Sequence, residues 1–241
     1  MSLRDTKSRV VILGMHRSGT SLLVGLLEQY GYQLGVVSNQ ISKFKPTGTK
    51  ENIELRRINN KIFQLNNCTW NNPKENLVIN DLIINKIKKV TKASSQYPKW
   101  AIKDPRMLLT YNFWLPYLPN HKIISTIRCP IEVAQSLFLK NKLPFNIGID
   151  IWHSYNTLLL QYWRKYRFPI LNFNLCKQDY FKQFLQLNDY LSIRVDGNKY
   201  NLFYQHKTVH AKSNCDFKLS SSVVELYNEL LNISNNNIYD R

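Results

Sequence analysis

A short apolar segment followed by a loop bounded by two glycines constrains the fold of this chain more than any other feature. Residues 10–13 (VVIL) form a continuous aliphatic run, which is typical of a buried parallel strand. The loop of residues 14–19 (GMHRSG) follows, and leucines at helical spacing over residues 20–30 predict a helix that ends at Gly31. This strand–loop–helix unit predicts an α/β protein in which the loop and the start of the helix bind an anion.

Three further segments have the pattern of buried strands and alternate with helical patterns. Strands are predicted at residues 100–102, 122–127 and 168–173. Pro130 falls at the first position of a helix after the second of these strands, and an amphipathic helix precedes the third, over residues 147–166. The alternation predicts a three-layer, doubly wound, mostly parallel α/β sheet with a P-loop-like strand–loop–helix unit at its N-terminus.

The length of 241 residues, of which 44% are hydrophobic, suits a single domain spanning residues 1–241. Within it, residues 38–98 mix polar loop with helical patches at residues 51–65 and 82–90. We expect residues 38–98 to form a lid or insertion on the acceptor side of the active site.

The C-terminal part carries weaker signals. An Asp-Gly pair within residues 191–217 suggests a turn without settling whether strands or a helix flank it. A last helix is predicted over residues 223–231, followed by an Asn-rich tail at residues 234–241 that we expect to be frayed.

The chain is strongly basic, with 33 Lys and Arg residues against 16 Asp and Glu, which gives a formal net charge of +17. Such a charge attracts nucleotides, acidic glycans, nucleic acid or anionic lipid, and does not choose among them. The four cysteines stand alone and no His cluster has metal-ligand spacing, so we expect neither a metal site nor a disulfide framework. A polar N-terminus and no apolar run of about 18 residues predict a cytoplasmic protein without a transmembrane segment.

The glycine-bounded loop has the GxxxxG spacing of nucleoside triphosphatase P-loops, but Thr20 stands where their signature has Lys. The cation lies inside the loop instead, as Arg17. In P-loop enzymes, Lys and Mg²⁺ together neutralise a triphosphate, so this loop suits the less charged end of a phosphosulfate better. The strand at residues 122–127 also ends in Arg128, where such an enzyme would be expected to have a Mg²⁺-binding Asp. The alternative is a tight strand-to-helix turn that binds no ligand.

Residues 17–21 (RSGTS) resemble the 5'-phosphosulfate loop of the sulfotransferases that use 3'-phosphoadenosine-5'-phosphosulfate (PAPS). Residues 128–137 (RCPIEVAQSL) resemble the 3'-phosphate element of this family, in which an Arg and a Ser eight residues later bind the donor. The resemblance spans residues 10–173 and implies PAPS as co-substrate, with no metal. The donor-binding residues that it implies are Gly14, His16, Arg17, Ser18, Gly19, Thr20, Ser21, Arg128 and Ser136.

Sulfuryl transfer requires a base for the acceptor proton, cations for the leaving oxygen and in-line alignment. Lys103 follows a predicted strand, within a KDPR segment that resembles the Lys-Asp-Pro element of tyrosylprotein and related bacterial sulfotransferases. The resemblance implies that Lys103 and Arg17 stabilise the transition state, while Asp104 or Arg106 orients Lys103 or contacts the acceptor. The alternative is a surface turn with an internal Asp–Arg pair.

Glu51 resembles the glutamate that follows the variable loop of this family, which implies that it is the general base. A carboxylate in a desolvated cleft also has the raised pKa that a base requires. The alternative is that Glu51 caps a helix. The other titratable candidates are Glu54, His16, His153 and His206.

These patterns together predict a sulfotransferase that moves a sulfuryl group from PAPS to a hydroxyl or amine and leaves 3'-phosphoadenosine-5'-phosphate (PAP). The acceptor is a small molecule, glycan or peptide, and the basic surface favours an acidic one. Two alternatives stay open: a P-loop phosphotransferase that uses Mg-ATP, and a non-catalytic basic module that binds nucleic acid or other anions. The sequence lacks RNP-like and basic-aromatic motifs, so we expect no nucleic-acid partner.

Overall fold

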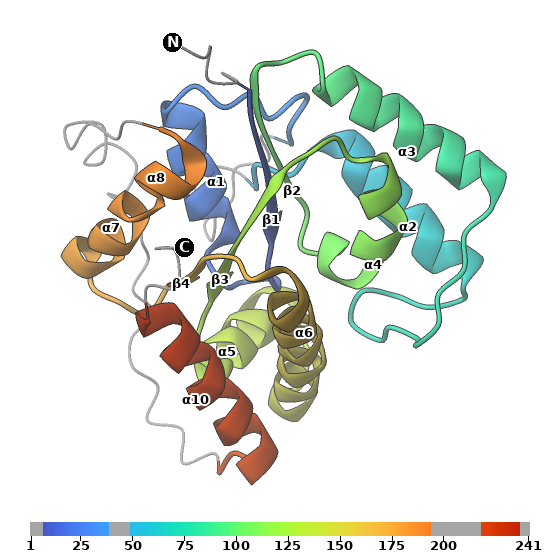
Figure 1. Cartoon of the computed structure of the whole chain (residues 1–241). Helices are drawn as coiled ribbons and strands as arrows, with labels where there is room; N and C mark the ends of the chain where they lie inside the picture. The colour runs from blue at the N-terminus through green and yellow to red at the C-terminus, as the bar shows by residue number, and fades with distance from the viewer. Residues whose placement is uncertain (1–6, 39–48, 194–217, 237–241) are drawn as a thin grey trace.

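The computed structural model describes residues 7–38, 49–193 and 218–236. Over these ranges, parallel strands form one four-stranded sheet in the order β2-β1-β3-β4 (Figure 1). The strands are β1 (Ser8–Leu13), β2 (Lys99–Lys103), β3 (Lys122–Ile127) and β4 (Ile170–Asn172). Each predicted strand is therefore confirmed, and β4 is shorter than predicted.

β1 lies inside the sheet and is apolar on both faces. Successive side chains of a strand point to opposite faces, so Val11 and Leu13 join one hydrophobic cluster while Val10 and Ile12 join the other. All four side chains are completely buried. Burial on both faces explains why this strand appears in the sequence as a continuous apolar run rather than an alternating one.

Helices cover both faces of the sheet, which confirms the three-layer, doubly wound prediction (Figure 1). One face packs against α1 (Thr20–Gln29), α7 (Lys177–Leu185) and α8 (Leu187–Leu191). The opposite cluster contains residues of α2 (Ile53–Leu65), α3 (Asp81–Ser94), α4 (Met107–Trp114), α5 (Pro130–Asn141), α6 (Phe145–Tyr166) and α10 (Ser221–Asn235). A short 3-10 helix, η1 (Leu115–Tyr117), follows α4. No helix in the described ranges is long and apolar enough to cross a membrane.

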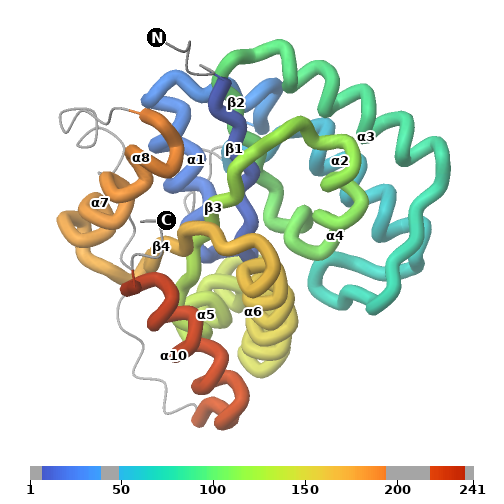
Figure 2. Tube along the Cα trace, viewed as in Figure 1, coloured from blue at the N-terminus to red at the C-terminus, as the bar shows by residue number. Residues whose placement is uncertain are grey.

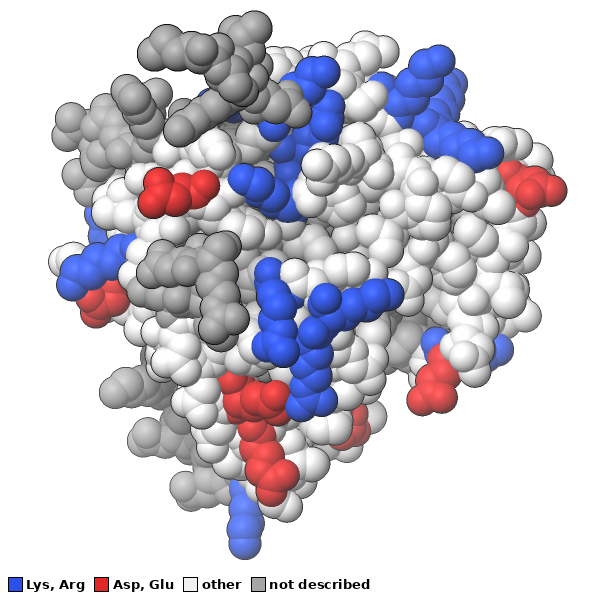
Figure 3. Space-filling model, viewed as in Figure 1, with Lys and Arg blue, Asp and Glu red and all other residues white. Residues whose placement is uncertain are grey.

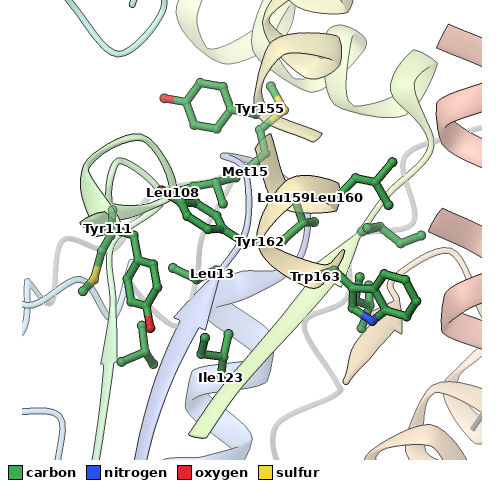
Figure 4. Close-up of a cluster of buried hydrophobic side chains, with 14 of the residues drawn as sticks. Leu13, Met15, Leu108, Tyr111, Ile123, Tyr155, Leu159, Leu160, Tyr162 and Trp163 are labelled. Carbon is green, nitrogen blue, oxygen red and sulfur yellow. The ribbon is translucent and has the colours of Figure 1, made fainter. Parts of the chain in front are cut away.

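The longest of these helices, α6, forms much of the core on its side of the sheet. Its residues Leu159 and Tyr162 lie in the same cluster as Leu13 of β1, Tyr111 of α4 and Ile123 of β3 (Figure 4). The amphipathic pattern over residues 147–166 therefore predicted a helix that packs on the sheet, and α6 starts two residues earlier.

α5 and α6 lie side by side (Figure 2). A Cβ atom added to Gly148 of α6 would lie 2.9 Å from the Cα atom of Ala134 in α5, so two small residues bring the helix backbones together. This packing holds α5 against the core and fixes the position of Ser136, which is 2% exposed.

The strand order indicates where a ligand binds. From β1 the chain passes to β2 on one side, then returns to β3 and β4 on the other side of β1, so the strand order reverses between β1 and β3. In doubly wound folds, ligands bind at such a switch point, beyond the carboxyl ends of the strands. The loop after β1 and Arg128 after β3 meet at this point.

The predicted lid, residues 38–98, contains two long helices. Residues 39–48 lie outside the described residues. Leu55, Ile58 and Ile62 of α2 and Ile87 of α3 belong to the main hydrophobic cluster, so this part of the region is built into the core. The function of residues 38–98 as a cover for the acceptor stays a prediction, as does the single-domain assignment.

The C-terminal helix is longer than predicted. α10 continues through Asn235, and the buried Ser234 accepts a hydrogen bond from Gln183 Nε2 at 3.0 Å through its carbonyl oxygen. The start of the tail that we expected to be frayed, residues 234–235, is therefore helical. Residues 194–217, which include the predicted Asp-Gly turn, and residues 237–241 lie outside the described residues.

Candidate active site

The loop after β1 leaves little room for a side chain at either of its two ends. Gly19 has a φ of 90°, and a Cβ atom there would lie 2.2 Å from Cδ2 of Phe173. A Cβ atom on Gly14 would lie 2.8 Å from Cγ2 of Thr20. Arg17, between them, has a φ of 66°, a left-handed conformation that is uncommon for a residue with a side chain and often occurs at functional sites.

This loop ends at the N-terminus of α1, which favours anions. The amide of Leu22 donates to the Gly19 carbonyl oxygen at 3.0 Å, so the amides of Thr20 and Ser21 precede the first intrahelical bonds. The positive end of the helix dipole lies at the same place. Ser18 Oγ is buried and has no hydrogen-bond partner among the described residues, which points to a ligand that would supply one.

Two arginines from different strand ends meet beside the loop. Arg17 Nε donates to Ser136 Oγ at 2.7 Å, and Arg128 Nη1 donates to the Arg17 carbonyl oxygen at 3.2 Å. Thr126 Oγ1 ties the loop to β3 by donating to the Ser18 carbonyl oxygen at 3.0 Å. Burial and then the charge of Arg128 lower the pKa of Arg17 to about 10. Because the charge of Arg128 acts unfavourably on that of Arg17, an anion bound beside both side chains would be favoured.

Arg128 is held in place by residues that the sequence analysis missed. Its Nε and Nη2 atoms both lie 2.8 Å from Oε2 of Glu132, one turn along α5. Asn174 Nδ2 donates to the other oxygen of Glu132 at 2.8 Å, and the guanidinium lies 5.2 Å from the centre of the Phe173 ring. The spacing of Arg128, just before α5, and Glu132, in its first turn, is the local signal in the sequence for this arrangement, since Phe173 and Asn174 come from the segment after β4.

Lys103 is buried at the carboxyl end of β2 and connects the loop with the predicted base. Its Nζ atom donates to Ser21 Oγ at 3.3 Å and to the Thr49 carbonyl oxygen, and lies 3.5 Å from Oε1 of Glu51. Burial lowers the pKa of Lys103, while the charges of Glu51 and Asp104 oppose this shift. The structure therefore brings three of the predicted site residues into contact at one point.

Glu51 lies beside two cations, with an exposed fraction of 6%. Besides Lys103, Arg106 Nη1 lies 3.7 Å from its Oε2 atom. Oδ1 of Asn52, not the carboxylate of Glu51, accepts from the amides of Glu54 and Leu55 at 3.1 and 3.2 Å and caps α2. The alternative that Glu51 caps a helix is therefore wrong.

Asp104 is completely buried and orients Arg106. Its Oδ1 atom accepts from the amide and Nη1 of Arg106 at 3.1 and 2.9 Å, and its Oδ2 atom accepts from Asn59 Nδ2 at 2.9 Å. Asn59 in turn accepts from Thr110 Oγ1 and Trp114 Nε1 at 2.8 and 2.9 Å. Asn59 has no local signal in the sequence, because its partners are 45 to 55 residues away.

A cavity of about 190 Å³ opens beside Glu51 and Arg17. Its other lining residues are His16, Thr49, Arg56, Trp70, Arg106, Leu137, Lys140 and Asn141. The rings of His16 and Trp70 form one wall, with their centres 4.3 Å apart. The structure thus places the predicted base and the predicted loop cation at the same opening.

Of the other candidate bases, His16 lines the same cavity as the predicted base, and the other two that the structure describes do not. Glu54 forms an ion pair with Arg57 on the exposed face of α2. His153 belongs to α6 and does not line the cavity, and His206 lies outside the described residues. In the part of the chain that the structure describes, no three His, Cys, Asp or Glu side chains gather to hold a metal ion.

A protein-family model described as the sulfotransferase family matches residues 9–172, which is well over half of the 241 residues. The chain belongs to the sulfotransferase family. The matched range nearly coincides with the predicted resemblance over residues 10–173 and contains every predicted donor-binding residue, together with Glu51 and Lys103. Sulfotransferases move a sulfuryl group, so the predicted general activity is confirmed.

Two solved sulfotransferase structures have the same fold. The sulfotransferase domain from the curacin biosynthetic pathway superposes with a TM-score of 0.62 at 14% identity, covering 93% of this chain and 98% of that domain. The domain from the Synechococcus PCC 7002 olefin synthase gives 0.60 at 16% identity, covering 93% and 95%. None of the curated proteins matches the sequence.

We predict that Gly19→Ala will lower the free energy of unfolding of this sulfotransferase by about 2–5 kcal/mol. The left-handed backbone costs a residue with a side chain roughly 1–2 kcal/mol, and the overlap with Phe173 adds roughly 1–3 kcal/mol. Urea denaturation measures the loss. Gly31→Ala is the matched control, because Gly31 has a φ of 88° but no atom within 4 Å of the added Cβ. Equal losses in the two variants would contradict the packing of Gly19 on Phe173.

Proposed function

We propose that this protein transfers the sulfuryl group of PAPS to a hydroxyl or amine of an acceptor and releases PAP. The observation that carries the proposal is the contact of Arg17, Ser136 and Arg128 at the switch point between β1 and β3. It provides positive charge and a hydroxyl where doubly wound folds bind nucleotides, without the Lys of a P-loop.

The residues at this point fit a nucleotide with anionic groups at both ends. The Ser18 hydroxyl and the amides at the start of α1 suit the phosphosulfate, together with Arg17. Arg128 and Ser136 suit the 3'-phosphate. Because Ser136 is hydrogen-bonded to Arg17, we expect Ser136 to exchange this partner for the 3'-phosphate when the donor binds.

In the proposed step, the acceptor oxygen or nitrogen attacks sulfur while the bond from sulfur to the bridging oxygen breaks. Glu51 takes the acceptor proton, and the electron pair of the broken bond stays on the 5'-phosphate oxygen of PAP. Lys103, protonated and within reach of the loop through Ser21, stabilises the charge on that oxygen. Arg106, held by Asp104, keeps the carboxylate of Glu51 oriented.

The Mg-ATP alternative has less support from the site. Asp104 follows β2 and is the acidic residue at the strand ends, but it is completely buried and bound by Arg106 and Asn59. Those contacts use both of its oxygens and leave no open carboxylate for Mg²⁺.

The surface also gives little support to a non-catalytic module for long polyanions. On the face shown in Figure 3, Lys and Arg side chains form several separate groups with acidic side chains among them. A nucleic-acid-binding surface usually has one continuous basic stripe.

Binding of PAP, 5'-AMP and Mg-ATP to the wild-type protein tests the proposed function. We expect PAP to bind at least tenfold more tightly than 5'-AMP without any metal, because hydrogen bonds to a charged group contribute roughly 1.5–3 kcal/mol. Isothermal titration calorimetry in the presence of EDTA measures the dissociation constants of PAP and 5'-AMP. A preference for Mg-ATP over PAP would contradict the proposal and favour the phosphotransferase.

A further inference from the structure

Two basic side chains of the active-site cavity have no role in donor binding or in the transfer step. Arg56 lies in the first turn of α2, which begins shortly after Glu51, and Lys140 lies one turn after Ser136 on α5. Both line the cavity that opens beside Glu51. They approach it from separate elements and therefore border the space where an acceptor would meet the base.

The charge of these two residues is not balanced within the described part of the chain. Arg106 pairs with Asp104 and Glu51, whereas Arg56 and Lys140 form no ion pair with any described residue. Glu51 is the one acidic residue among the cavity-lining side chains, against Arg17, Arg56, Arg106 and Lys140. The described cavity wall therefore carries an excess of positive charge.

Lys140 also experiences this excess directly. Burial and then the charge of Arg17 lower the pKa of Lys140, while the charge of Glu51 opposes the shift. An anion near Lys140 would relieve the repulsion from Arg17. The groups that face Lys140 thus make an anionic ligand favourable at this side of the cavity.

We propose that the acceptor carries a carboxylate or sulfate group, which binds to Arg56 and Lys140 while the acceptor hydroxyl faces Glu51. This inference rests on the proposed function, and it assigns the acceptor to a chemical class. The half-buried Trp70, whose ring is tilted by 42° against that of His16, supplies an apolar wall that suits the ring of a sugar or another small cyclic acceptor.

Binding of three sugars to the PAP-saturated protein tests the assignment. Glucuronate, glucose 6-sulfate and glucose differ at one carbon, and saturating PAP fills the donor's own anion sites. We expect at least one of the two anionic sugars to bind tenfold or more tightly than glucose, as measured by calorimetry or by quenching of tryptophan fluorescence. The difference in affinity between glucuronate and glucose 6-sulfate shows whether the site prefers a carboxylate or a sulfate group.

Variants of Arg56, Lys140 and Arg57 test which side chains cause the preference for an anionic sugar. Arg56→Ala and Lys140→Ala should each reduce the preference for the anionic sugar about tenfold and leave PAP affinity unchanged. Arg57→Ala is the matched control, because Arg57 follows Arg56 on α2 but pairs with Glu54 outside the cavity. Equal binding of all three sugars, including no detectable binding of any, would overturn the inference, as would an equal effect of Arg57→Ala. Failure of PAP itself to bind would instead overturn the proposed function.

Discussion

Glu51→Gln is expected to lower kcat for sulfuryl transfer by about two to four orders of magnitude, the usual contribution of a general base. Glutamine keeps the size and hydrogen-bonding shape of the side chain but does not accept the acceptor proton. The carboxylate lies 3.5 Å from Lys103 and 3.7 Å from Arg106, at the opening of the cavity. Turnover is measured as the release of PAP from PAPS. The acceptor in this assay is the alcohol, phenol or amine that the wild type uses fastest.

The affinity for PAP separates a chemical role of Glu51 from a structural one. We expect PAP to bind Glu51→Gln within about twofold of the wild type, since the proposed donor contacts come from the loop after β1, from Arg128 after β3 and from Ser136 of α5. Glu54→Gln is the matched control, because Glu54 lies one turn further on the exposed side of α2. Full turnover by Glu51→Gln would assign the base to another residue.

Lys103→Met is expected to lower kcat by about two to three orders of magnitude, because it removes a buried cation at the place where the leaving oxygen gains charge. Methionine approximates the length of the lysine side chain and fills the same buried space. Initial rates of PAP release at saturating PAPS measure the loss. Unchanged kcat in Lys103→Met would contradict the role of Lys103 in the transfer step.

The pH dependence of kcat identifies the active form of Lys103. Burial lowers the pKa of this ammonium, so its charge is lost at a pH below the ordinary lysine value of about 10.4. Since the proposed step requires the charged form, kcat of the wild type should fall on the alkaline side at that lower pH. In the Lys103→Arg variant the arginine side chain stays charged at every accessible pH, so the alkaline fall in kcat of this variant should move to higher pH. An unmoved alkaline fall would show that another group controls it.

The strands and the donor loop could be predicted because their signals are local. β1, its loop and α1 are consecutive in the chain, and burial on both faces leaves a clear apolar run at residues 10–13. β3 and the proline at the start of α5 are equally local. In contrast, α4 and α7 were missed, because α4 is apolar on most sides and α7 is only 9 residues long, so neither gives an extended helical pattern in the sequence.

The residues that hold the catalytic side chains in place, or that line the cavity, could not be predicted, because their positions depend on contacts between distant segments. Asn59 becomes important only when α2 packs beside the end of β2, and Asn174 only when the segment after β4 reaches Glu132. Arg56 and Lys140 look like ordinary surface cations in the sequence, and only the fold places them at one cavity. The same fold brings Arg17 against Ser136, which the sequence analysis had assigned to opposite ends of the donor.

The most direct test of the account is a thermodynamic cycle between Arg128 and the 3'-phosphate. The dissociation constants of PAP and 5'-AMP are measured for the wild type and for Arg128→Ala. We expect the wild type to prefer PAP by tenfold or more, and the variant to bind both nucleotides with nearly equal affinity while its affinity for 5'-AMP changes little. The same preference for PAP in both proteins would contradict the assignment of Arg128 to the 3'-phosphate and, with it, the proposed donor site.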